Sequence, residues 1–193
     1  MKLLQNLPIH FNDPEFREDA LRGISKTVTH MNHLVGRLGH LRHELKIQPT
    51  LVNLNDVVTN ALAVFENKTE GRLIKDLQPL PKIPLDHEQM LKVVTNLVLN
   101  AKEASPSDSQ VRVTTTHDKN WVVLPVADNG CGMNPEFLQR SLFRPFQTTK
   151  KSGLGIGMFQ SKMIIEAHRG RIAVASEPGK GTTFQVFLPT AAQ

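Results

Sequence analysis

The sequence predicts an α+β fold: a sandwich of one mixed sheet and helices, preceded by a long helix. Alternating β-branched runs, which are typical of strands, are interleaved with helical repeats of three and four residues, and the regular βαβ spacing of a doubly wound sheet is missing. The hydrophobic content of 39% and the charged content of 21% are close to globular averages. A chain of 193 residues therefore has room for one well-filled domain and a modest appendage.

The appendage is expected at the N-terminal end, as one long helix over residues 13–46. Asp13 can cap this helix and Pro14 is tolerated at its first position. Apolar residues then recur three and four apart, as on a helix that packs lengthwise against others: Leu21, Ile24, Val28, Met31, Val35, Leu38 and Leu45. We therefore expect residues 1–47 and 48–193 to form separate domains.

The second domain is expected to begin near residue 48, because Pro49 interrupts the helical period. Asp86 and Gln89 form a capping box that opens an apolar helix, which ends by Ser105 and Pro106. The predicted elements, in order, are a strand at 49–54, a helix at 55–65, a Gly- and Pro-rich segment at 71–84, the helix after Asp86, strands at 110–116 and 121–127, a helix at 157–168, and strands at 171–175 and 182–188. Short polar turns join both later strand pairs, which predicts two hairpins.

Composition narrows the partners and the compartment. The net charge of +5 would suit nucleic acid, but the Lys and Arg residues are scattered, and one Trp with no Tyr offers little to stack on bases. No apolar run approaches the roughly 20 residues of a membrane span, so we expect no membrane contact by this segment. The single cysteine, Cys131, fits a reducing compartment, which predicts the cytoplasm; attachment of a longer protein to a membrane through other sequence stays open.

Two asparagines four residues apart are the first candidate site. Asn96 and Asn100 lie on one face of the predicted helix, while the leucines and valines between them face the core. An amide oxygen is a hard ligand that suits Mg²⁺, which binds few protein groups besides phosphates and water. Taken alone, the pair is better explained as two exposed asparagines.

The second candidate follows the strand that ends at residue 127. Asp128 stands where that strand ends, and the Asn-Gly-Cys-Gly turn after it allows the backbone to approach a ligand closely. A carboxylate there can accept a hydrogen bond from the amino group of adenine and would disfavour guanine, which has an acceptor oxygen at that position. An ordinary turn explains Asp128 alone, but it does not predict the glycine cluster about 20 residues later.

That cluster, Gly153, Gly155 and Gly157, leads into a helix, so free amides and the helix dipole favour a bound triphosphate. A dinucleotide-binding turn is excluded because a polar stretch, and no strand, precedes it. The segment between residues 134 and 152 has Phe143 and Phe146 as anchors and Lys150 and Lys151 near its end, which indicates a lid over the nucleotide.

In this order and spacing, the segments resemble the N, G1, F and G2 boxes of the histidine kinase branch of the GHKL ATPase superfamily, and residues 179–184 resemble its final glycine motif. The resemblance covers about residues 48–189. It implies the GHKL (Bergerat) fold, ATP and Mg²⁺ as cofactors, and the catalytic module of a two-component sensor histidine kinase. Asn100 is the implied Mg²⁺ ligand, and the implied nucleotide contacts are Asn96, Asn100, Asp128, Gly130, Gly132, Met133, Phe143, Phe146, Lys150, Gly153, Leu154, Gly155, Gly157, Met158 and Thr182.

One residue departs from the family pattern, and two further segments extend the resemblance. Glu103 stands where many members have a basic residue, so phosphate contact there would fall to Lys102. The long helix resembles the second helix of the dimerisation and phosphotransfer bundle, which implies a homodimer and a response-regulator receiver domain as a partner. Residues 13–16 and 30–34 resemble, more finely, the orphan sensor kinases linked to exosortase (PEP-CTERM) systems.

The resemblance also implies a phosphoaccepting histidine, and none is expected here. The family motif His-Glu-x-x-Asn/Thr is approached only at His43, with Ile47 in place of Asn or Thr. Too few residues separate His43 from Asn96 for a returning bundle helix. We therefore expect the acceptor upstream of this chain, on a first helix of which residues 2–12 are the end, and no catalytic residue within the chain.

Two other functions stay open from the sequence. The first is a degenerate module whose ATP state alters partner contacts without kinase activity. The second is a hydrolysing GHKL ATPase, which is disfavoured because Asn96 stands where those enzymes carry a glutamate base.

Overall fold

The computed structural model describes residues 14, 18–25, 45–66, 72–106, 109–150 and 153–190. The chain divides into two units, Met1–Glu44 and Leu45–Gln193. In the first unit the described residues 14 and 18–25 are helical, as predicted, and the rest of that predicted helix up to residue 44 lies outside the described part. The predicted helix end at residue 46 is wrong, because Leu45 and Lys46 lie in neither helix nor strand.

The physical reason is an extended entry into the second unit. Pro49 disfavours helical backbone in the residue before it. The backbone N–H of Gln48 donates to Oδ2 of Asp86 at 2.9 Å. Leu45 packs against the hydrophobic core of the second unit. These contacts replace the helical hydrogen bonds that the sequence pattern predicted.

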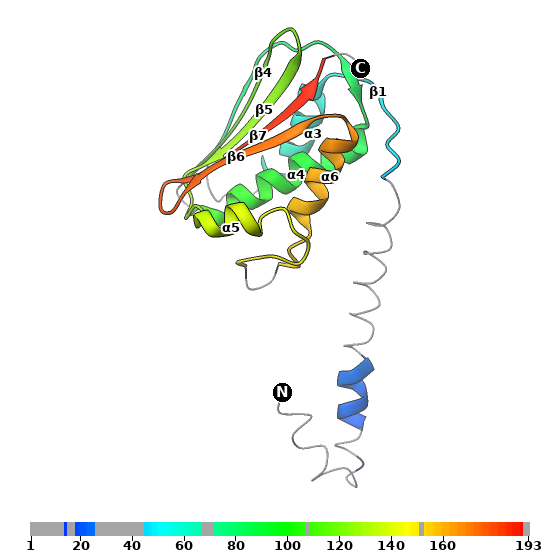
Figure 1. Cartoon of the computed structure of the whole chain (residues 1–193), viewed down its shortest axis with the longest axis vertical. Helices are drawn as coiled ribbons and strands as arrows, with labels where there is room; N and C mark the ends of the chain where they lie inside the picture. The colour runs from blue at the N-terminus through cyan, green and yellow to red at the C-terminus, as the bar shows by residue number, and fades with distance from the viewer. Residues whose placement is uncertain are drawn as a thin grey trace. The chain divides into compact units, whose positions relative to one another are not determined.

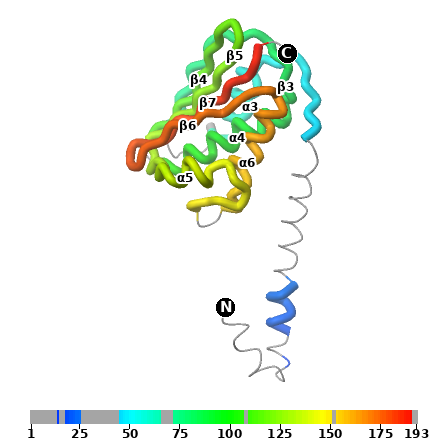
Figure 2. Tube along the Cα trace, in the orientation of Figure 1, coloured from blue at the N-terminus to red at the C-terminus, as the bar shows by residue number. Residues whose placement is uncertain are grey.

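The second unit is a two-layer sandwich with one five-stranded mixed sheet in the order β2-β4-β5-β7-β6. Its strands are β2 (Arg72–Leu77), β4 (Gln110–His117), β5 (Trp121–Asp128), β6 (Arg171–Glu177) and β7 (Gly181–Pro189). The β2–β4 pair is parallel and the other pairs are antiparallel. The C-terminal strand β7 thus lies between β5 and β6, as Figure 2 shows. The predicted α+β class and both predicted hairpins are confirmed.

Helices cover one face of this sheet (Figure 1): α3 (Leu54–Glu66), α4 (His87–Ala104) and α6 (Gly157–Ala167), with the short α5 (Pro135–Arg140) at one end. Helix α4 is central, since it packs against α3, α6 and three strands of the sheet. The predicted N-cap at Asp86 is confirmed, because its side chain accepts a hydrogen bond from the N–H of Gln89 at 3.0 Å. The reciprocal half of the predicted capping box is not formed, because the Asp86 N–H donates to Nε2 of His168 at 2.9 Å.

The burial pattern of α4 explains how it serves both the core and a site. Its buried residues recur at helical spacing, as expected for a face that packs on a sheet: Met90, Val93, Val94, Leu97, Val98 and Ala101. Asn96 and Asn100 are half-buried at the flank of this face, on the side where α6 packs. The apolar spacing that anchors the helix therefore fixes the direction of both amides.

Three elements were missed in the sequence. The segment 71–84, predicted as a Gly- and Pro-rich connection, holds β2 and also β3 (Ile83–Leu85), which pairs with β1 (Thr50–Val52) in a separate two-stranded sheet. Strand β2 lacks clean alternation because it lies at the sheet edge, and β3 is only three residues long. Helix α5 lies inside the predicted lid; Asn134 caps it and Pro135 opens it, a signal that was present in the sequence.

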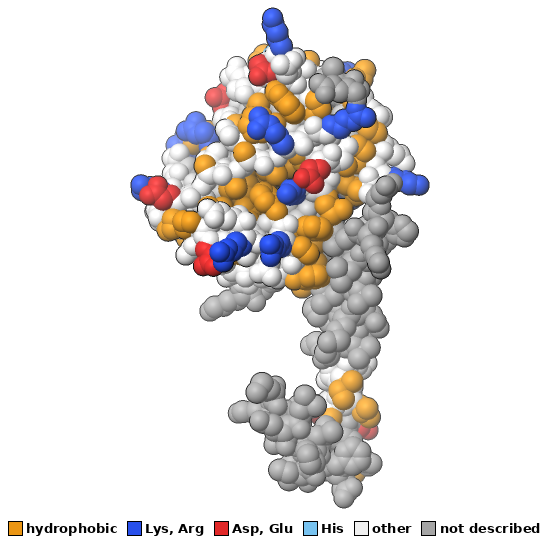
Figure 3. Space-filling view, in the orientation of Figure 1, with side chains coloured by type: hydrophobic (Ala, Val, Ile, Leu, Met, Phe, Trp, Pro, Cys, Tyr) orange, Lys and Arg blue, Asp and Glu red, His pale blue; other side chains and the backbone are white. Residues whose placement is uncertain are grey.

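The surface of the described residues bears on two expectations from the sequence, that this segment does not contact a membrane and does not bind nucleic acid. No helix among them combines the length and the apolarity that a membrane crossing requires. On the face shown in Figure 3, Lys and Arg side chains are scattered, and several of them lie beside an Asp or Glu side chain.

Candidate functional site

Asp128, the last residue of β5, is held by backbone amides. Its Oδ1 accepts hydrogen bonds from the N–H of Gly130 at 2.8 Å and from the N–H of Thr182 at 3.2 Å. The residue is 6% exposed. No buried side-chain N or O atom of the described residues lacks a hydrogen-bond partner. Oδ2 has no partner among these residues and is therefore not fully buried, so it can accept a hydrogen bond from a ligand.

Burial also sets the protonation of this carboxyl. Desolvation raises the pKa of Asp128 above the usual value, and the hydrogen bonds from Gly130 and Thr182 oppose that rise without cancelling it. Exposed Asp118 accepts two backbone hydrogen bonds of similar length, from Asn120 and Trp121, and these hold its pKa below the usual value. The two aspartates differ in burial. A carboxyl group whose pKa is raised by burial is typical of functional sites in clefts.

Glycines allow the turn after Asp128 to lie against two other segments. A Cβ on Gly130 would lie 2.3 Å from the carbonyl oxygen of Ala104, at the end of α4. The same oxygen accepts the Cys131 N–H at 2.9 Å, so the turn satisfies a free carbonyl of the helix end. Gly132 has φ of +65°, and a Cβ there would lie 2.0 Å from the carbonyl oxygen of Glu177. No other residue fits either position.

Hydroxyl groups complete this end of the site from the β6–β7 hairpin. Thr182 is buried, and its hydroxyl lies 2.9 Å from the hydroxyl of Ser176. Ser176 in turn accepts the N–H of Met133 at 2.9 Å. Asp128, Met133 and Thr182, which were predicted as ligand contacts from separate motifs, are therefore joined in one hydrogen-bonded network.

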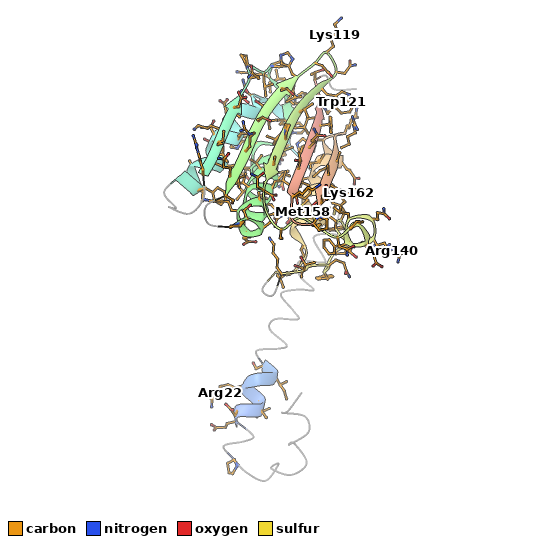
Figure 4. The ribbon with its side chains drawn as sticks, turned by 90° about the vertical axis from the view of Figure 1, so that its left-hand side faces the viewer. Arg22, Lys119, Trp121, Arg140, Met158 and Lys162 are labelled. Atoms are coloured by element: carbon orange, nitrogen blue, oxygen red, sulfur yellow. The ribbon has the colours of Figure 1, made fainter. Side chains whose placement is uncertain are left out.

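Asn96 and Asn100 contact the start of α6. The Asn96 amide donates to the hydroxyl of Ser161 at 3.0 Å. Both asparagine amides also lie within hydrogen-bond range of the Met158 sulfur, at 3.6 Å for Asn96 and 3.3 Å for Asn100. A Cβ on Gly157 would lie 2.4 Å from Oδ1 of Asn96, so glycine is what allows α6 to approach α4 here. Figure 4 places Met158 at the start of α6.

The start of α6 offers free backbone donors. Its N-cap residue, Ile156, makes no side-chain cap, and the first turn holds no acidic residue. The first N–H groups of a helix have no acceptor within the helix. Together with the positive end of the helix dipole, they favour a bound anion such as a phosphate.

The loop before α6 packs against residues 146–148, and this packing uses two residues with positive φ. Gly155 has φ of +66°, and a Cβ there would lie 2.6 Å from the backbone of Gln147. Phe146 has φ of +63°, and its N–H donates to the Gly155 carbonyl at 3.0 Å. Gly153 lies against the side chain of Thr148, and Leu154 is 37% exposed. The predicted phosphate loop and the predicted lid, residues 134–152, therefore form one connected structure.

Lid residues differ in how they are anchored. Phe143 is half-buried against the core, and the ammonium of Lys162 lies 5.4 Å from the centre of its ring. Phe146 is 41% exposed. Lys150 donates to Oδ1 of Asn100 at 2.7 Å and forms an ion pair with Glu103. Lys151 lies outside the described residues.

Helix α4 connects the two ends of this arrangement. Ala104 touches the turn after Asp128, and Asn96, eight residues earlier, touches the start of α6. Eight residues of helix span about 12 Å, which suits an extended nucleoside triphosphate. The predicted contacts thus gather along one helix, with the Asp128 carboxyl group near one end and the first amides of α6 at the other.

Two partners were not predicted. Ser161 and Ser176 hold site residues by hydrogen bonds, and a single serine in a sequence carries no signal for such a role. Glu103 was noted as a departure, but its contact with Lys150 could not be foreseen, since it depends on the path of the lid.

A metal ion would find limited protein ligands here. Among the described residues, no three His, Cys, Asp or Glu side chains gather to hold one. Asn100 Oδ1, however, already accepts a cationic group, the Lys150 ammonium. This fits a cation that binds one amide oxygen and takes its other ligands from phosphate and water, as Mg²⁺ does.

Comparisons with known proteins give the following matches. A family model described as "Histidine kinase-, DNA gyrase B-, and HSP90-like ATPase" matches residues 85–192. Signal transduction histidine-protein kinase AtoS of Escherichia coli (strain K12) is 33% identical over 183 residues, and the match covers 92% of this chain but only 30% of AtoS.

Solved structures give matches of the same kind. The catalytic domain of histidine kinase ThkA is similar with a TM-score of 0.68 and 25% identity, over 75% of this chain and 97% of that domain. ThkA in complex with the response regulator protein TrrA has a TM-score of 0.70 and 23% identity, over 98% of this chain and 56% of that one. The second match shows likeness of fold alone.

Proposed function

Since the chain belongs to the histidine kinase-, DNA gyrase B- and HSP90-like ATPase family and is the ATP-binding catalytic region of a sensor histidine kinase, we propose that it binds Mg-ATP along α4 and donates the γ-phosphoryl group to a histidine. One observation carries this proposal. Asp128 has one oxygen fixed by two backbone amides and a second oxygen without a protein partner. The turn after it lies against the end of α4, the helix whose Asn96 contacts the start of α6.

At the adenine end, Asp128 Oδ2 accepts the amino group of the base. Gly130 and Gly132 let the turn after Asp128 pack against Ala104 and Glu177, which holds Asp128 in place. Thr182 and Met133 belong to the same hydrogen-bonded network. Guanine carries an acceptor oxygen where adenine carries its amino group. An acceptor at this position therefore selects ATP over GTP.

At the phosphate end, the glycines at 153, 155 and 157 and the first amides of α6 surround the triphosphate. Asn100 holds Mg²⁺ and Asn96 positions the metal or its water. When bound, Mg²⁺ neutralises charge on the phosphate oxygens. Leu154, Phe143 and Phe146 shield the phosphates from water when the lid closes.

This arrangement favours transfer over hydrolysis. The Asn96 side chain is a neutral amide that donates to Ser161, so it cannot act as the base that activates water. AtoS and ThkA are named histidine kinases. Neither the degenerate module nor the hydrolysing ATPase is favoured by these observations.

The whole kinase reaction involves partners beyond this chain. The unit Met1–Glu44 belongs to a dimerisation and phosphotransfer bundle and dimerises with a second copy. The histidine lies upstream, and His43, outside the described residues, is not the acceptor. A response-regulator receiver domain takes the phosphoryl group. The fragment works in the cytoplasm, and the finer exosortase-linked resemblance stays a prediction.

The test is phosphoryl transfer from γ-labelled ATP. An N-terminally extended chain that includes the upstream helix should acquire an acid-labile, base-stable label, as phosphohistidine does, and His43→Gln should not reduce it. The present chain should bind ATP, turn it over very slowly and take no label. Labelling of the present chain that is lost in His43→Gln would overturn the acceptor assignment. Rapid phosphate release without any labelled protein would overturn the kinase proposal.

A further inference from the structure

A lysine of the lid lies on the oxygen that is proposed to hold the metal. The Lys150 ammonium donates to Oδ1 of Asn100 at 2.7 Å and pairs with Oε2 of Glu103. Asn100 and Glu103 are three residues apart on α4, so their side chains are neighbours on one helix face. One cationic group thus bridges an amide oxygen and a carboxylate oxygen.

The orientation of the Asn100 amide is fixed by its partners. An ammonium group can only donate, so the atom that faces Lys150 must be the amide oxygen. The amide nitrogen then faces the sulfur of Met158 at 3.3 Å, which is a weak acceptor. Asn100 therefore presents its oxygen to Lys150 and its nitrogen to Met158.

Amide and carboxylate oxygens are the ligands that a small divalent cation prefers. A second cation cannot join the ammonium on the same oxygen without strong repulsion. The ion pair between Lys150 and Glu103 is itself about half exposed, with relative side-chain exposures of 36% and 47%. Such pairs stabilise weakly, so this one can be exchanged for a stronger partner.

We propose that Lys150 occupies a divalent-cation position formed by Asn100 and Glu103, and that it closes the lid onto α4 until ATP arrives. The triphosphate then takes the ammonium of Lys150, which frees Asn100 Oδ1 and the Glu103 carboxylate for the metal. This inference rests on the proposed function. It also gives Glu103, the departure from the family pattern, a role as a cation ligand.

The test uses Mn²⁺ as the probe, with the 193-residue chain and no nucleotide, and free Mn²⁺ is measured by electron paramagnetic resonance. Lys150→Met removes the ammonium and exposes both oxygens, so it should tighten Mn²⁺ binding about tenfold. Lys119→Met is the matched control, because Lys119 lies in the β4–β5 turn at the far end of the domain from Met158 (Figure 4). It should leave Mn²⁺ binding unchanged.

Adding Asn100→Ala to Lys150→Met should return Mn²⁺ binding to the wild-type level, and Lys150→Ala should reproduce the gain. The proposal is overturned if Lys150→Met binds Mn²⁺ no better than Lys119→Met, or if the gain survives Asn100→Ala. Thermal unfolding of each variant verifies that the fold is kept. Titration of ATP into the wild-type chain is measured separately, so a failure to bind ATP counts against the proposed function and a failure of the Mn²⁺ series counts against the Lys150 role.

Discussion

Replacing Asp128 by Asn changes one atom at the adenine end of the site. Gly130 and Thr182 both donate to Oδ1, so the oxygen of the new amide must take that position to keep both bonds. The amide nitrogen then replaces Oδ2. It presents donors to the adenine amino group, which is itself a donor, and one acceptor is lost.

The size of the effect follows from the charge that is removed. A hydrogen bond to a charged group contributes about 1.5–3 kcal/mol. A loss of about 2 kcal/mol raises the dissociation constant of ATP roughly 30-fold. GTP should lose less or gain, because its base offers an oxygen to the new amide. The fold should lose little stability, since the substitution keeps both backbone bonds and removes a charge that burial disfavours.

Isothermal titration calorimetry with ATP and GTP measures both effects. Asp118→Asn is the matched control, because Asp118 also accepts two backbone hydrogen bonds but is exposed in the β4–β5 turn. It should leave both affinities unchanged. Unaltered ATP affinity in Asp128→Asn, with the fold intact, would refute the adenine assignment.

Three further predictions follow from the same geometry. Asn100→Ala should abolish the Mg²⁺ dependence of ATP binding and spare adenosine affinity; equal calorimetric losses for both ligands would mean that the helix is damaged. Gly132→Ala should lower the free energy of unfolding by roughly 3 kcal/mol, because its Cβ would lie 2.0 Å from the Glu177 carbonyl. Gly179 also has a positive φ, but a Cβ there would lie in open space, so Gly179→Ala should lower it by about 1 kcal/mol. Urea unfolding measures both changes. The raised pKa of Asp128 adds stability at low pH that is lost as pH rises through the folded-state pKa, so a urea series above pH 4 should show a decline that Asp128→Asn lacks.

Local patterns were enough to predict most of the elements. The β-branched run at 121–127 predicted β5, and the capping signal at Asp86 predicted the start of α4. These signals are local, because strand pleat and helix period act within a few residues. The parallel pairing of β2 with β4 is not local, and the β2 sequence does not alternate, so no short-range pattern could reveal it.

The candidate site shows the same limit. The glycine motifs predicted a close approach of the backbone to a ligand. The structure shows a close approach to other segments of the chain: Ala104 for Gly130 and Asn96 for Gly157. The contact of Lys150 with Asn100 depends on a lid path that is set by positive φ at Phe146, which is unusual for a residue with a side chain. Sequence alone gave no reason to expect it.

Amide chemical shifts of the isotope-labelled chain test the central claim most directly, since they report both ends of the proposed ATP site at once. Adenosine should shift the amides of Gly130 and Thr182, which donate to Asp128. Mg-ATP should shift these and also the amides of Gly157 and Met158 at the start of α6, whereas the amide of Asn120, which donates to Asp118, should move with neither ligand. Saturating Mg-ATP that leaves Gly130 and Thr182 unmoved, or that shifts only amides away from α4 and α6, would contradict the account.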